Sequence, residues 1–139
     1  MTAKLMLIYV SSYLAAAVVF CVLDFIWLGF VMKDFYASQI GALLLEKPRW
    51  VVAAAFYALY LVGVLFFVVM PALHSGEASR AVFYGAVLGL LAYGTYDLTN
   101  LATLKGWSVA VSLVDIGWGA VVTSAAATAG YFAAKLLLN

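Results

Sequence analysis

Residues 51–73 read VVAAAFYALYLVGVLFFVVMPAL, and the only ionisable side chains among them belong to two tyrosines. A helix needs about 20 predominantly apolar residues to cross the hydrocarbon core of a bilayer, and this stretch is long enough. Three further apolar stretches occupy residues 5–32, 81–104 and 109–138. A lone strand in lipid would leave its backbone polar groups unpaired. The predicted fold class is therefore all-α, an integral membrane bundle of four transmembrane helices forming a single domain over residues 1–139.

The composition agrees with a membrane location. The chain is 68% hydrophobic and 9% charged, against roughly 45–50% and 25% in soluble domains. A soluble domain of this size is mostly surface and could not bury so much apolar side chain. The net charge of +1 offers no basic surface for nucleic acid, so membrane lipids are the expected partners. The single cysteine, Cys21, excludes an internal disulfide.

The connections between the stretches differ in kind. Residues 33–50 carry apolar side chains at helical spacing, which predicts a short interfacial helix between helices one and two. Pro71 is expected to end the second span, and 105–108 forms a tight hairpin that makes helices three and four antiparallel neighbours. Four basic residues flank the spans on one side and three on the other, a bias too small to set the orientation.

Three aspartates interrupt the apolar stretches: Asp24, Asp97 and Asp115. Counted from Lys33 and Lys105, each lies eight to ten residues from the same membrane face, which corresponds to roughly 12–15 Å along a helix. A carboxylate at mid-helix costs roughly 2.5–3.5 kcal/mol on insertion scales, and such residues mark binding or transfer sites in membrane proteins. Three at one depth predict an intramembrane acidic site.

Other residues accompany the aspartates. A polar stripe at three- and four-residue spacing on helix three is expected to face the bundle, because Gly85 and Gly89 on the same helix would let a neighbouring helix approach closely. A tryptophan also follows Asp24 and Asp115 one turn later, on the same helix face. The candidate ligand- or ion-binding residues beside the aspartates are Tyr93, Tyr96, Asn100, Trp27 and Trp118.

Three functions fit this pattern. The preferred one is binding or transfer of a proton, a cation or a small polar ligand by the aspartates. The second is a membrane-embedded enzyme or accessory protein in lipid modification, with Asp97 as acid or base and Asn100 and Tyr96 orienting the substrate. The third is a structural or assembly subunit of a larger membrane complex, in which aspartates only hold helices together. The sequence has no metal-ligand spacing and does not identify a cofactor. A homodimer or a larger membrane complex is the expected assembly under the first function.

Two runs of sequence resemble a known family. Residues 92–107, AYGTYDLTNLATLKGW, and residues 114–119, VDIGWG, resemble a family of small bacterial inner-membrane proteins catalogued as domain of unknown function 2177. The resemblance extends to LDFIW at 23–27 and to the Pro71–Ala72 turn. It implies a four-helix fold in the bacterial inner (cytoplasmic) membrane. It implies no activity, cofactor or site residue.

Overall fold

The computed structural model describes residues 3–138, and all regular structure in this range is helical. Four helical stretches are long and apolar enough to cross a membrane, which confirms the predicted fold class: Ala3–Val31, Trp50–Ser75, Ala78–Thr103 and Val109–Leu138. The elements are α1 (Ala3–Ile26), η1 (Trp27–Val31), α2 (Lys33–Ile40), η2 (Gly41–Leu43), α3 (Trp50–Val64), η3 (Leu65–Val69), α4 (Met70–Ser75), α5 (Ala78–Thr103) and α6 (Val109–Leu138).

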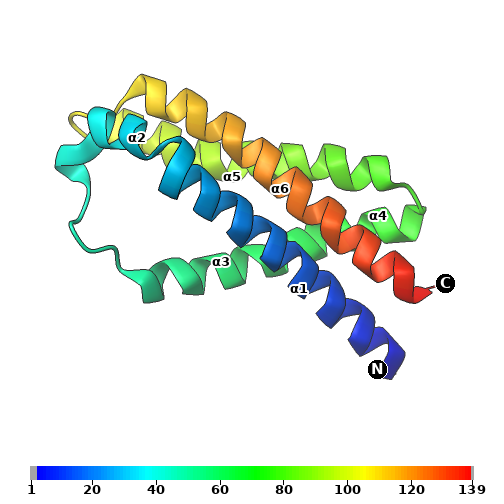
Figure 1. The fold of residues 1–139 in the computed structure, drawn as a ribbon. Coiled ribbons are helices and arrows are strands. Elements are labelled where there is room, and N and C mark those ends of the chain that lie inside the picture. Colours follow the sequence, from blue (N-terminus) through cyan, green and yellow to red (C-terminus); the bar gives the residue numbers. More distant parts are fainter. Residues whose placement is uncertain (1–2, 139) are drawn as a thin grey trace.

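The C-terminal helix α6 is the centre of the bundle. It runs antiparallel to α5 on one side and packs along α1 on the other (Figure 1). Helix α3 approaches the others mainly through its C-terminal part and η3. Helix α2 lies at the end of the bundle where α5 turns into α6, and both chain termini lie at the opposite end (Figure 1).

Glycines allow α5 and α6 to pack backbone against backbone. A Cβ atom at Gly89 would lie 2.0 Å from the carbonyl oxygen of Gly119, and one at Gly85 would lie 2.8 Å from the Cα of Ser124. Both distances are far below van der Waals contact. In lipid, where no hydrophobic force drives helices together, such close packing supplies much of the attraction between them.

The second span differs from the prediction at Pro71. The helix does not end there but continues through α4 to Ser75, where Gly76 closes it with a left-handed φ of 73°. Proline has no backbone N–H and its ring disturbs the preceding turn. The π-helical turn η3 directly precedes this position, and such local adjustments allow a proline inside a membrane-spanning helix. The predicted short helix between the first two spans is confirmed as α2 and η2.

An apolar core fills the middle of the bundle and the half that bears the termini. One cluster of fully buried side chains joins η3 and α4 to α5 and α6, and a second joins α1 and α3 to α6. The largest buried members are Tyr131, Phe20 and Leu61. The buried carboxyl groups lie beyond this core, towards the end that carries α2.

Candidate functional site

Asp24 is a buried residue with two hydrogen-bond donors. On helix α1 every fourth residue from Ile8 to Asp24 is buried in the bundle. Asp24 is the last of these residues and is 4% exposed. The indole Nε1 of Trp118 on α6 donates to Oδ1 at 3.0 Å, and the hydroxyl of Tyr57 on α3 donates to Oδ2. Asp24 thus ties α1 to α3 and α6, and both of its oxygens have partners.

Asp115 on α6 is half-buried and is bonded to the interfacial helix. The hydroxyl of Tyr36 on α2 donates to its Oδ1 at 2.6 Å, and the indole Nε1 of Trp27 donates to the same hydroxyl oxygen at 3.2 Å. Burial, together with the hydrogen bond to Asp115, raises the pKa of Tyr36. The hydroxyl therefore stays protonated at neutral pH and remains a donor to Asp115.

Asp97 on α5 differs from the other buried polar residues because its side chain has no hydrogen-bond partner. Its side chain is fully buried, and neither oxygen has a hydrogen-bond partner. It is the one buried side chain in residues 3–138 with this property. Its carboxyl group lies within interaction range of Asp115 and of Trp107 without completing a hydrogen bond to either. Buried polar groups are nearly always paired, so such a group calls for an explanation.

The prediction of three equivalent intramembrane aspartates needs correction. Only Asp24 and Asp97 are buried, whereas Asp115 is partly exposed. Asp115 lies near the start of α6, where the short helix α2 covers it through Tyr36 and leaves part of it open. Within residues 3–138 no three His, Cys, Asp or Glu side chains converge as metal ligands. Both oxygens of Asp24 therefore have hydrogen-bond partners, whereas Asp97 and Asp115 lie beside each other as a separate pair.

The other predicted site residues differ in how deeply they are buried and in what they contact. The rings of Trp27 and Trp118 stack 4.2 Å apart and almost parallel, at 1°, so these two indoles link the Asp24 contacts to the Tyr36 contacts. Tyr93 and Asn100 are half-buried. Tyr96 is 56% exposed and packs edge-on against Trp107. Of the predicted polar stripe, Asp97 therefore faces the inside of the bundle, whereas Tyr96 lies on its outer surface.

Two tyrosines that contact the acids were missed from the sequence. Tyr36 looked like part of the apolar face of an interfacial helix, and Tyr57 lies in the span that has no charged residue. Both donate a hydroxyl to an aspartate on another helix. The sequence offered only a weak signal for these contacts. A tyrosine in one span can donate to an acid in a neighbouring span when that acid has no partner in its own helix.

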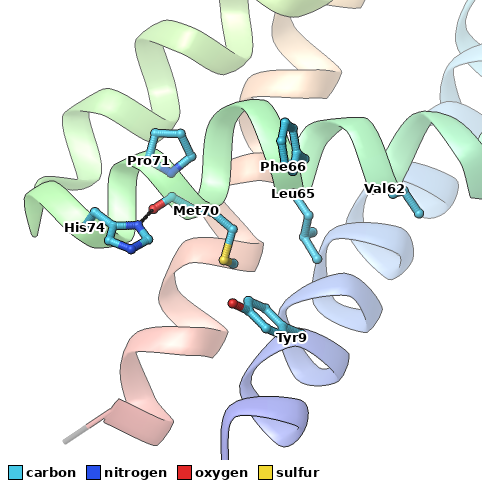
Figure 2. Close-up of a pocket in the computed structure, with 7 residues that line it drawn as sticks. All are labelled: Tyr9, Val62, Leu65, Phe66, Met70, Pro71 and His74. Carbon is cyan, nitrogen blue, oxygen red and sulfur yellow. Dashed lines mark hydrogen bonds between the residues drawn. The ribbon is translucent and has the colours of Figure 1, made fainter. Parts of the chain in front are cut away.

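An apolar groove lies away from these acids, between α1 and the η3–α4 segment (Figure 2). It has a volume of about 510 Å³, and its lining includes Tyr9, Met70 and His74. The Nδ1 of His74 lies 2.8 Å from the carbonyl oxygen of Met70; because a carbonyl only accepts, Nδ1 carries the proton. None of the predicted site residues lines this groove.

The fold and these contacts define a multi-pass α-helical membrane protein in which the buried Asp97 lies beside the partly exposed Asp115 near one end of the bundle. The chain belongs to the family described as "Predicted membrane protein (DUF2177)", whose family model matches residues 9–132. The resemblance seen in the sequence is thereby confirmed. Neither the search of curated proteins nor the search of solved structures found a match.

Proposed function

We propose that this protein binds and transfers a single positive charge, as a proton, a small cation or the cationic group of a small polar ligand, at Asp97 and Asp115. The observation that carries the proposal is the fully buried Asp97, with neither oxygen hydrogen-bonded. Moving an ionised carboxylate out of water without a partner is very costly, and in practice the group is neutralised. A second carboxyl group beside it increases that cost.

Among the residues that the structure describes, no positive side chain forms an ion pair with either carboxyl group. Lys33 and Lys105, the basic residues that flank this layer in the sequence, are exposed. The one ion pair within residues 3–138 joins Arg80 to Glu77 at the other end of the bundle. Neutralisation therefore falls to something bound, either a proton shared by the two carboxyls or a cation beside them.

The number of oxygens favours a monovalent occupant. Ca²⁺ takes six to eight oxygen ligands, and Mg²⁺ requires nearly ideal octahedral geometry. The pair offers two carboxyl groups, and a third acid does not converge on them among the described residues. A single proton can be shared by two adjacent carboxyl groups, as in other carboxyl dyads.

Location and assembly complete the proposal. The membership of the chain in a family of predicted membrane proteins, and its four spans, support a multi-pass protein; we place it in the bacterial inner membrane on the resemblance. Four helices enclose little volume, so a homodimer or a larger complex is the proposed assembly. The helix-linking contacts of Asp24 support a structural role for that residue alone.

The test is infrared spectroscopy of the purified protein in nanodiscs, with native mass spectrometry in Na⁺ and K⁺ salts. Wild type is compared with Asp97→Asn and with Asp34→Asn, a matched control in which an exposed carboxyl of α2 is changed. A buried carboxylic-acid band, or a one-cation adduct, should be present in wild type and Asp34→Asn and absent in Asp97→Asn. Identical spectra and no adduct in all three proteins would refute the proposal.

A further inference from the structure

The polar groups around Asp97 are arranged asymmetrically along the membrane normal. On the side of α2, Trp107 donates through Nε1 to the Oγ of Ser112 at 3.1 Å, and Ser108 donates through Oγ to the Oε1 of Gln39 at 2.8 Å. Tyr36 joins the same side through Asp115. Side chains that can hydrogen-bond water or an ion therefore extend from the carboxyl pair towards the end of the bundle that carries α2.

The opposite side of the pair is closed by apolar side chains. The clusters that contain Phe20, Leu61 and Val68 fill the bundle there, and each of these three is at most 2% exposed. The buried hydroxyls of this half are engaged: Ser12 donates to the carbonyl oxygen of Gly130 at 2.9 Å, for example. Among the described residues, every buried side-chain polar atom of this half has a hydrogen-bond partner, and the groups are separated by apolar side chains.

Helix α2 is held over the open side by few contacts. Two side-chain hydrogen bonds tie it to α6 and the preceding hairpin, through Tyr36 and Gln39, and Ile40 is its one buried residue. It follows the π-helical turn η1 and precedes the short 3₁₀ turn η2. Single π-helical turns interrupt regular helices, often at functional sites, and segments with few buried contacts open most readily.

We infer that the Asp97–Asp115 site exchanges its occupant with water only at the membrane face covered by α2, and that α2 is a lid held shut by the hydrogen bond from Tyr36 to Asp115. This inference rests on the proposed function. In the observed conformation α2 covers the site. When α2 moves away, the site opens towards one face only. A charge cannot pass from it to the other face without a rearrangement of the apolar core.

Thiol labelling tests the sidedness. In a Cys21→Ala background, Ser112→Cys and Ser12→Cys place a thiol at two serines that are at most 1% exposed, one in each half of the bundle. Glu46→Cys and Ser79→Cys report the two membrane faces. A membrane-impermeant maleimide is added to sealed vesicles of either orientation, and labelling rates are measured with and without Tyr36→Phe.

Ser112→Cys should react slowly, and only from the face that labels Glu46→Cys. Tyr36→Phe should raise that rate at least about tenfold, because it removes a hydrogen bond to a charged acceptor. Ser12→Cys should stay unreactive from both faces. Labelling of Ser112→Cys from the Ser79 face, or an unchanged rate in Tyr36→Phe, would overturn the lid while the infrared signature of Asp97 survives. Loss of that signature in wild type would remove the proposed function and the inference together.

Discussion

Substitution by asparagine should destabilise the fold at Asp24 but not at Asp97, the other buried aspartate. Asp24→Asn weakens a satisfied acceptor, because an amide has one oxygen where the carboxylate offers two to Trp118 and Tyr57. A hydrogen bond to a charged group contributes about 1.5–3 kcal/mol. The loss of one such bond should therefore lower the free energy of unfolding by about 1.5–3 kcal/mol.

Asp97→Asn should cost nothing measurable and can stabilise the fold. The side chain keeps its shape, no existing hydrogen bond is lost, and a buried group that needs neutralisation becomes neutral. Functional sites commonly retain groups that reduce stability. The variant should therefore unfold at the same free energy as wild type or at a higher one, because the amide removes the cost of burying an ionisable carboxyl group.

The assay is equilibrium unfolding in mixed micelles, by titration with sodium dodecyl sulfate and far-ultraviolet circular dichroism. Asp34→Asn on the exposed face of α2 serves as the neutral control, since surface substitutions usually stay within about 0.5 kcal/mol. The reasoning fails if Asp97→Asn is as destabilising as Asp24→Asn. That result would make Asp97 a structural residue with partners of its own.

Three further predictions concern the packing and the lid. Gly89→Ala brings a methyl group to 2.0 Å from the Gly119 carbonyl oxygen and should destabilise the bundle by about 3 kcal/mol or more. Gly94→Ala adds a carbon with no atom within 4 Å and should stabilise α5 by about 0.5–1 kcal/mol. Equal stabilities of the two variants in the same titration would contradict this. The pKa of Tyr36 is raised by burial and by Asp115, so its contribution to stability is present below the ordinary tyrosine value of about 10 and is lost as the pH rises above it. The stability difference between wild type and Tyr36→Phe should shrink above about pH 10, and a difference that is constant with pH would be the wrong result. Cys21→Ala, at an exposed thiol, should shift the unfolding free energy by less than about 0.5 kcal/mol; a larger shift would show that Cys21 packs against a neighbour.

Much of the fold could be predicted because lipid imposes simple rules on the chain. The length of each apolar stretch gives a span, since every backbone polar group must be paired inside its own helix. The small residues Gly85 and Gly89 indicate where a neighbouring backbone can approach. Pro71 misled because a helix of this length can absorb a proline through a π-helical turn and continue.

The site was harder to predict than the spans. Asp24, Asp97 and Asp115 stood out because charged residues are rare in hydrocarbon. Their different surroundings did not, because a helix that is apolar on every side has no amphipathic stripe to show which side faces its neighbours. The sequence therefore gave only a weak sign that Tyr57 would meet Asp24.

The sequence alone determined that the chain spans a membrane four times, that it carries acids near one face, and that it resembles one family. These follow from composition and from distances along a helix, which are local properties. Only the tertiary structure decided that Asp24 is satisfied by Trp118 and Tyr57, while Asp97 is buried without a partner beside Asp115. The rotation of each helix about its axis decides this, and that rotation is set by packing between segments far apart in the chain.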